Sequence, residues 1–211
     1  ANVEYRLCRT QNADDSIASY ITVNDTVTFN GLSQNTDYFI YVRTICEQSA
    51  SAWSILNIKT LKTPATVPYF TDFSNDDDNA LWTMQNNIST GLVNKFYIGA
   101  ATGAVYVGDK ALYVSNTGND LAYSGTNSRS TANRRITFEP GTYVIRFKYK
   151  SEGEGTFDYG RAFLAPDDVT IDLGIMPNVT ANRLPDGCIA VDNGVKMSEV
   201  TTWQEMVATV D

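Results

Sequence analysis

Acidic side chains gather in the segment FTDFSNDDDN, which contains Asp72, Asp76, Asp77 and Asp78 beside two asparagines. Calcium takes six to eight oxygen ligands, and carboxylates, amide oxygens and backbone carbonyls supply such oxygens. The spacing is not that of an EF-hand loop, and a solvated acidic turn accounts for the four acids equally well. The segment therefore leaves two alternatives, a structural calcium site and an acidic turn without metal.

A second acidic cluster, SEGEGTFDYGR, contains Glu152, Glu154 and Asp158. A glycosidase needs two carboxyl groups, about 5–5.5 Å apart in a retaining enzyme and about 6.5–9.5 Å apart in an inverting one. Glu152 and Glu154 lie in a glycine-rich turn without aromatic support, where a raised carboxyl pKa is hard to arrange. We therefore expect a connection between two strands here and not a catalytic pair.

Histidine is absent from all 211 residues. This absence excludes Ser-His-Asp and Cys-His nucleophiles, histidine-ligated zinc and the commonest general base near neutral pH. The three cysteines, Cys8, Cys46 and Cys188, have no CxxC spacing, so neither a zinc site nor a redox pair is indicated. We expect no enzymatic activity and no catalytic residue.

Aromatic side chains offer a β-protein another way to bind, because sugar rings stack on tyrosine and tryptophan faces while polar side chains bond the hydroxyls. The chain supplies several candidates for a glycan groove, although most of them should lie in the core or on strand faces: Tyr97, Tyr106, Tyr113, Tyr123, Tyr159 and Trp203.

The charge balance limits the partners. Sixteen Lys and Arg against 24 Asp and Glu give a formal net charge of −8, and no basic run interrupts it. Nucleic acid and anionic membranes are therefore poor partners. No stretch of about 18 apolar residues occurs, so we expect no membrane insertion.

The elements that position these groups are predicted to be nearly all β, because apolar residues alternate or form short β-branched runs and helical spacing is scarce. In the first third we expect strands at 3–9, 19–23, 26–30, 37–46 and 53–60. The second series is expected at 69–73, 81–84, 95–99, 110–114, 134–138, 141–150, 160–164, 190–195 and 207–211.

Two prolines and the loss of alternation in TLKTPATVP indicate a semi-rigid linker between two domains. We expect a first domain at residues 1–62, a linker at 63–67 and a second domain at 68–211.

The stretch GLSQNTDYFIYVRTIC places Leu32, Thr36 and Tyr38 in the spacing L-x-x-x-T-x-Y. This pattern resembles the corner leading into strand F of fibronectin type III modules, in which a buried tyrosine bonds a backbone group a few residues upstream. The resemblance implies that Tyr38, Ile40 and Val42 face the core and that the first two strands of the module are missing. An incomplete sheet leaves backbone groups unpaired at its edges, so chains could associate there.

The same resemblance implies that Cys8 and Cys46 lie on neighbouring strands, so a disulfide between them and two unpaired cysteines are both open alternatives. Their parities differ, because Val3, Tyr5 and Leu7 point inward and Cys8 outward, whereas Cys46 shares the inward parity of Tyr38.

An ordered series of motifs marks the second domain: PYFTDF, ALW, FYIG, KALYVSN and EPGTYVIRFKYKSEGEGTFDYGRAFLAP. Together they resemble bacterial adhesin-type jelly-roll domains of the cleaved-adhesin, MAM-like and choice-of-anchor families. The resemblance implies a jelly-roll β-sandwich whose last strands are missing. It also implies a structural calcium near the first strand, with Asp72 the preferred ligand and Asp76 and Asp78 the other candidates; no other cofactor is expected.

These observations predict an all-β chain, a partial fibronectin type III sandwich followed by a jelly roll. We expect a non-catalytic segment of a secreted or surface-attached bacterial protein that binds a host protein or glycan in adhesion or substrate attachment. Two alternatives stay open: accessory domains of a secreted peptidase or glycan-degrading enzyme whose catalytic domain lies outside these residues, and a structural spacer.

Overall fold

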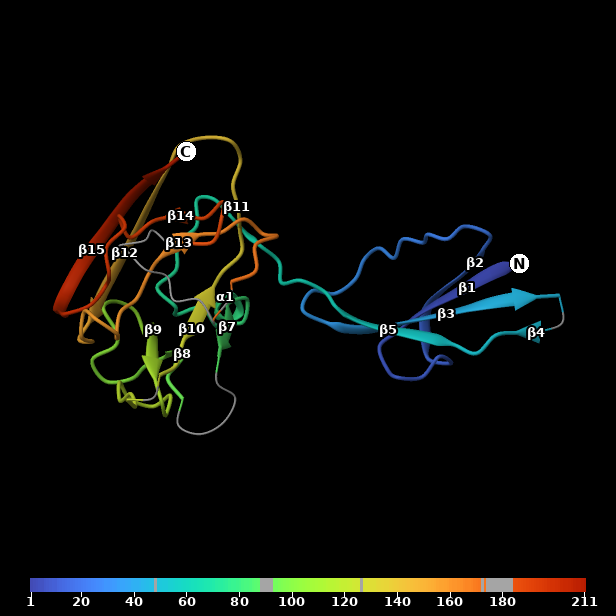
Figure 1. The fold of residues 1–211 in the computed structure, drawn as a ribbon, viewed down its shortest axis with the longest axis horizontal. Coiled ribbons are helices and arrows are strands. Elements are labelled where there is room, and N and C mark those ends of the chain that lie inside the picture. Colours follow the sequence, from blue (N-terminus) through green and yellow to red (C-terminus); the bar gives the residue numbers. More distant parts are fainter. Residues whose placement is uncertain (48, 88–92, 126, 172, 174–183) are drawn as a thin grey trace. The chain divides into compact units, whose positions relative to one another are not determined.

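The computed structural model describes residues 1–47, 49–87, 93–125, 127–171, 173 and 184–211. The chain divides into two compact units, Ala1–Thr63 and Pro64–Asp211 (Figure 1). Strands and one short helix are the regular elements, which confirms the predicted all-β fold class. In the described residues, no helix is long and apolar enough to cross a membrane.

The first unit is built on one antiparallel sheet. It contains β1 (Asn2–Cys8), β2 (Ser16–Thr22), β3 (Asp37–Cys46), β4 (Ser49–Ala50) and β5 (Ser54–Lys59). The order is β2-β1-β3-β4, and β5 pairs with β3 beside β4. β3 is the centre of the sheet because it hydrogen-bonds to β1 along one edge and to β4 and β5 along the other.

The register of β1 and β3 confirms that Tyr38, Ile40 and Val42 share one face of the sheet. Leu7 lies opposite Ile40 and Tyr5 opposite Val42, so the alternating apolar residues of both strands point the same way. Tyr38 and Leu7 are buried on this face, whereas Ile40 and Val42 are half-buried.

The opposite face also contains buried residues, among them Glu4, Tyr41 and Cys8. The expectation that Cys8 points out to solvent is wrong, since its side chain is fully buried. Alternation along β1 does place Cys8 on the face opposite Leu7, and the register irregularity beside it lies in β2, since Leu7 pairs with Ala18 and Cys8 with Ser16. This second face of the sheet is therefore covered at Cys8 and is not open to solvent there.

The predicted strand at residues 26–30 is absent from the described structure. This segment follows β2 as irregular chain, and the ring of Phe29 packs against Tyr20 with the ring centroids 5.4 Å apart. The alternating apolar residues of this segment therefore provide an aromatic contact, and the segment does not pair with a strand.

The second unit contains one helical turn, α1 (Asp76–Asn79), and paired short strands. The strands are β6 (Ala65–Thr66), β7 (Thr83–Asn86), β8 (Lys95–Gly99), β9 (Ala111–Ser115), β10 (Ser130–Asn133), β11 (Ile136–Thr137), β12 (Tyr143–Ser151), β13 (Phe163–Leu164), β14 (Ile189–Ala190) and β15 (Val200–Val210). The pairs are β6 with β11, β7 with β10, β8 with β9, β12 with β15 and β13 with β14.

Two apolar clusters lie among these ribbons. One joins Ala101, Ala104 and Tyr113 beside β9, and the other joins Val191, Ala208 and Val210. Tyr143, Ile145 and Phe147 of β12 pack on the second cluster, as their alternation along the strand predicts.

Several boundaries differ from the sequence prediction. The segment 69–73 forms no strand, whereas 130–133 does, although its residues Ser-Thr-Ala-Asn carry little apolar signal. β15 begins at Val200 and not at residue 207, because its polar first half pairs with the second half of β12, Glu205 with Lys148 and Val200 with Ser151. Ala65 and Thr66, expected in the linker, pair in parallel with Ile136 and Thr137 of the second unit.

Candidate functional site

The acidic segment around residue 76 forms the capped helical turn α1. The side-chain oxygen of Asn75 accepts hydrogen bonds from the backbone N–H groups of Asp77, at 2.9 Å, and of Asp78, at 3.3 Å. Three aspartates in the first turn suit the positive end of a helix, where carboxylates are stabilised. The aspartates of this segment therefore lie where the N–H groups of the first helical turn favour negative charge.

Asp78 is held by two partners from elsewhere in the unit. Arg134 reaches one carboxylate oxygen with Nε at 3.1 Å and Nη2 at 2.9 Å, and the Tyr69 hydroxyl donates to the other at 2.5 Å. Burial raises the pKa of Tyr69, and the adjacent carboxylate raises it further. Both oxygens of Asp78 are thus engaged by donors.

Asp76 and Asp72 have different partners. The Lys110 ammonium bonds the carboxylate of Asp76 and lowers its pKa, with a smaller contribution from the amide of Asn79. Asp72 accepts a hydrogen bond from the backbone N–H of Ser74 at 3.0 Å. These three candidate ligands therefore do not converge.

Within the described ranges, no group of three or more Cys, Asp or Glu side chains is placed to hold a metal ion. The guanidinium on Asp78 and the ammonium on Asp76 put positive charge where a calcium ion would need free oxygens. Asp76 and Asp78 are therefore engaged by cations in this structure, and the calcium site with Asp72, Asp76 and Asp78 stays a prediction.

The second acidic cluster lies in an exposed turn after β12. Glu152, Glu154 and Asp158 are all exposed, and the backbone N–H of Asp158 donates to the carbonyl of Glu154 at 3.0 Å. Glu199 closes the turn from the other side, since its N–H donates to the Gly153 carbonyl at 3.0 Å.

The six aromatic candidates divide between core and surface. Tyr97 and Tyr113 stack with their centroids 6.1 Å apart, and Tyr113 is buried with its hydroxyl donating to the Gly118 carbonyl at 2.6 Å. Tyr106 and Tyr123 are exposed. Trp203 packs against Tyr106 at 5.2 Å between ring centroids.

Trp203 belongs to what we call the outer face of β12 and β15. It consists of alternate residues of the two paired strands together with the ring of Tyr106: Val144, Arg146, Lys148, Lys150, Trp203, Glu205, Val207 and Thr209. The Lys148 ammonium lies 5.6 Å from the Tyr106 ring centroid, and the Lys150 ammonium lies 5.4 Å from that of Trp203. Basic and aromatic side chains therefore lie beside one another on one surface.

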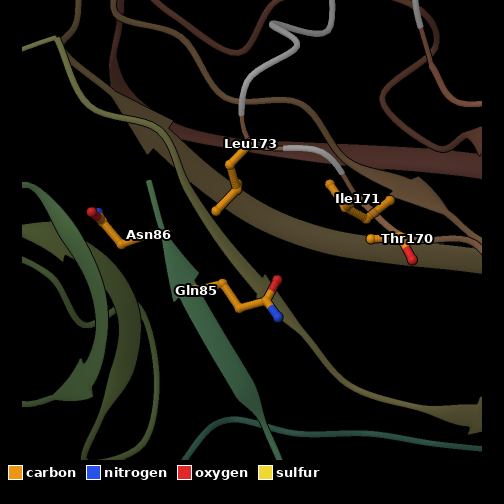
Figure 2. A pocket seen from close by; sticks show the side chains of 5 residues that line it. All are labelled: Gln85, Asn86, Thr170, Ile171 and Leu173. Atoms are coloured by element: carbon orange, nitrogen blue, oxygen red, sulfur yellow. The ribbon is translucent and has the colours of Figure 1, made fainter. Parts of the chain in front are cut away.

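A separate opening of about 730 Å³ lies beside β7. Its described lining consists of Gln85, Asn86, Thr170, Ile171 and Leu173. Figure 2 shows that the side chains of Gln85 and Asn86 leave the strand in opposite directions. The lining offers amide and hydroxyl groups beside aliphatic ones and, among the described residues, no ionisable side chain.

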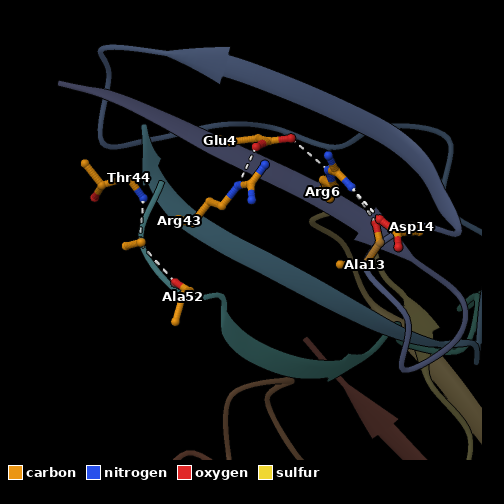
Figure 3. A network of polar contacts seen from close by, with 8 residues as sticks. Glu4, Arg6, Ala13, Asp14, Arg43, Thr44 and Ala52 are labelled. Atoms are coloured by element: carbon orange, nitrogen blue, oxygen red, sulfur yellow. Dashed lines mark hydrogen bonds and ion pairs between the residues drawn. The ribbon is translucent and has the colours of Figure 1, made fainter. Parts of the chain in front are cut away.

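In the first unit, the buried carboxylate of Glu4 joins two arginines across neighbouring strands (Figure 3). Its two oxygens accept hydrogen bonds from the Nε atoms of Arg6 and Arg43, each at 2.7 Å. Burial raises the pKa of Glu4, but the bonds and charges of Arg43 and Arg6 outweigh it, so the pKa lies below its ordinary value.

Trp53 completes this network. The guanidinium carbons of Arg43 and Arg6 lie 4.2 and 5.0 Å from its ring centroid, and Tyr41 meets the ring edge-on at 5.9 Å. The Trp53 ring holds both guanidinium groups in position for their hydrogen bonds to Glu4. The cluster therefore stabilises the sheet.

A buried ion pair between Arg161 and Asp192 organises the second unit near β13. Their side chains are 3% and 0% exposed, and Asp192 also accepts hydrogen bonds from the backbone N–H groups of Ala162 and Gly194, each at 2.9 Å. The sequence gives no signal for this pair or for Arg134 with Asp78, because 31 and 56 residues separate the partners.

The three cysteines are free thiols. Cys8 of β1 lies opposite Phe39, near the start of β3, whereas Cys46 is the last residue of β3. At the rise of a strand, Phe39 and Cys46 are about 23 Å apart, so Cys8 lies far from Cys46 along the sheet. The register therefore excludes a bridge between Cys8 and Cys46 in this sheet. Burial raises the pKa of the Cys8 and Cys188 thiols.

Comparisons with protein-family models, with curated proteins and with solved structures find no match to this chain.

Proposed function

We propose that the chain is a non-catalytic recognition segment of a secreted or surface-attached bacterial protein, which binds a host protein or glycan. In this proposal residues 1–62 belong to a fibronectin type III-like module and residues 68–211 to an adhesin-type jelly roll.

The observation that carries the proposal is the outer face of β12 and β15. Val144, Val207 and Tyr106 are 55%, 40% and 52% exposed there, beside basic side chains of β12. Exposed apolar groups gathered on one surface are typical of interaction sites, whereas single ones are ordinary.

The engagement of the acidic side chains supports recognition over catalysis. Asp78, Asp192 and Glu4 each bond arginine donors, and their contacts hold the fold together. A general acid must be free to give its proton to a substrate, whereas these three carboxylates are held in hydrogen bonds to arginines.

The experiment is a binding screen of the chain 1–211 against immobilised extracellular-matrix proteins and a glycan array, with heat-unfolded chain as the control. We expect saturable binding to a subset of ligands by the folded chain alone. A blank screen together with turnover of a peptide or polysaccharide substrate would overturn the proposal.

A further inference from the structure

We propose that the outer face of β12 and β15 binds a polysaccharide that carries one carboxylate per repeat, such as a uronate polymer. This inference rests on the proposed recognition function and names its site and its ligand chemistry.

The cations of the outer face differ from others of the second unit in their bonding partners. Four other cations of the second unit bond aspartates: Arg134 with Asp78, Arg135 with Asp167, Arg161 with Asp192 and Lys110 with Asp76. Arg129 and Lys196 bond backbone carbonyls instead. On the outer face, Arg146 has no hydrogen bond or ion pair within the part of the chain that the structure describes, and Lys150 has only the Trp203 ring. In a chain of net charge −8, these positive groups are held apart from the abundant carboxylates.

The basic side chains of β12 are spaced along the strand. Arg146, Lys148 and Lys150 occupy alternate positions of β12, so their side chains leave the same face at intervals of about 6.6 Å. Only Lys148 meets a carboxylate, Glu205, with the two charged atoms 3.4 Å apart. Arg146 and Lys150, on either side of Lys148 along β12, are therefore separated positive charges with no carboxylate partner among the described residues, which suits an extended polymer with separated negative charges.

An aromatic pair lies beside these basic side chains. Tyr106 and Trp203 pack with their ring planes 59° apart, and Tyr106 is 52% exposed. An exposed phenol ring offers a flat apolar surface to the C–H face of a sugar, and its hydroxyl bonds polar groups. A carboxylate-bearing sugar supplies both the ring for Tyr106 and the anion for Arg146 or Lys150.

The overall charge selects among polyanions. Nucleic acids, heavily sulfated glycans and anionic membranes have dense negative charge, which an acidic chain repels at long range. An acidic peptide matches the cations but brings no ring to stack on Tyr106. A sparsely charged polysaccharide meets the local row of cations with the least repulsion from the rest of the chain.

The test titrates the chain 1–211 by calorimetry with hyaluronan oligosaccharides, which have one carboxylate per disaccharide. Heparin oligosaccharides, neutral maltoheptaose and polyglutamate are the comparison probes. We expect hyaluronan oligosaccharides to bind more tightly than all three, and the binding to weaken as salt is raised. Tighter binding of heparin or polyglutamate than of hyaluronan would overturn the proposed ligand chemistry.

The variant R146A/K150A locates the site, and Lys95→Ala is the matched control, since Lys95 is an exposed cation of the same unit on β8. We expect the double variant to bind hyaluronan about tenfold more weakly and the control to bind as the parent does. Tyr106→Ala should weaken binding too, without changing the salt dependence. Circular dichroism of each variant confirms that the fold is kept.

The outcomes separate this inference from the proposed function. If the parent binds glycans or proteins in the screen and R146A/K150A binds them equally well, the site assigned here is wrong and the recognition function stands. If the folded parent binds no ligand of any class, both are wrong.

Discussion

The hydroxyl of Tyr38 accepts a hydrogen bond from the backbone N–H of Ser33 at 2.9 Å, and the ring of Tyr38 is 1% exposed. This bond lowers the pKa of the Tyr38 phenol, because the donated N–H favours the charged form. The second unit contains a related contact, in which the Tyr143 hydroxyl donates to the Glu139 carbonyl at 2.6 Å. In both units a tyrosine near the start of a long strand fixes the preceding turn.

Tyr38→Phe should destabilise the first unit by about 1–2 kcal/mol, since it leaves the Ser33 N–H without its acceptor at a half-buried position. Denaturant unfolding followed by tryptophan fluorescence measures the change. Tyr41→Phe is the control, because the Tyr41 hydroxyl makes no hydrogen bond within the described residues. Equal losses in the two variants would contradict the role given to the bond.

Glu4→Gln should destabilise the first unit by roughly 2 kcal/mol at neutral pH. The glutamine amide can accept from one arginine but turns its own NH₂ toward the other, so one guanidinium loses its acceptor. Chemical denaturation of the variant and the parent gives the difference.

The same carboxylate makes a prediction about pH. The pKa of Glu4 is below its ordinary value of 4.5. The contribution of the ionised carboxylate to the free energy of unfolding is therefore complete above pH 4.5 and is lost as the pH falls through the folded-state pKa. The stability difference between parent and Glu4→Gln should therefore shrink on acidification below about pH 4.5. A difference that stayed constant from pH 7 to about pH 3 would contradict the ion-pair explanation.

The parts of the fold that the sequence predicts best are long strands with a strict alternation. β3 and β8 have the predicted bounds, because apolar residues at every second position leave one choice of face. The bond between the Tyr38 hydroxyl and the backbone upstream was expected as well, from the resemblance that the spacing of Leu32, Thr36 and Tyr38 carries. Local patterns report local geometry.

The contacts that depend on distant partners were not predictable in this way. Asp78 reads as a free acid until Arg134 is placed beside it, and Asp192 gives no sign that Arg161 will bury with it. β10 was missed because its polar residues gain their strand geometry from pairing with β7. Tyr106 and Trp203 are candidates in the sequence, but nothing in the sequence shows that they lie beside the basic side chains of β12.

Asp192→Asn should destabilise the second unit by about 3–5 kcal/mol, because it leaves Arg161 buried without a counter-charge. The exposed pair of Arg135 and Asp167 provides the contrast, with side chains 30% and 63% exposed. Asp167→Asn should lower stability by less than about 1 kcal/mol. Differential scanning calorimetry ranks the two variants, and a similar shift for both would show that burial does not decide their effect.

Calcium and a chelator should leave the melting temperature unchanged, since donors already engage Asp78 and Asp76. Asp78→Asn should lower the melting temperature equally with and without calcium, because the variant loses the ion pair with Arg134. A calcium-induced rise in melting temperature that Asp72→Asn abolishes would support the calcium site that the sequence suggests.

Gly108→Ala should destabilise the loop that faces the acidic segment. Gly108 has a φ of +77°, and a Cβ there would lie 2.7 Å from Ser74 Oγ and 2.9 Å from Asp72 Oδ2. The variant must strain the left-handed backbone and also displace Ser74, whose hydroxyl accepts a hydrogen bond from the Asp109 N–H at 3.1 Å. We expect a loss of about 2–3 kcal/mol in chemical denaturation.

Gly103→Ala separates these two effects within the same unit. Its φ of +81° imposes the same backbone strain, but the nearest atoms to its Cβ, on Leu121 and Lys150, lie 3.9 Å away. We therefore expect Gly103→Ala to cost only the strain, about 1 kcal/mol. Because the two glycines differ in the contact with Asp72 and Ser74, the excess loss in Gly108→Ala measures how firmly that pair holds the acidic segment. Equal losses would mean that the segment yields freely and that Asp72 is not fixed by its neighbours.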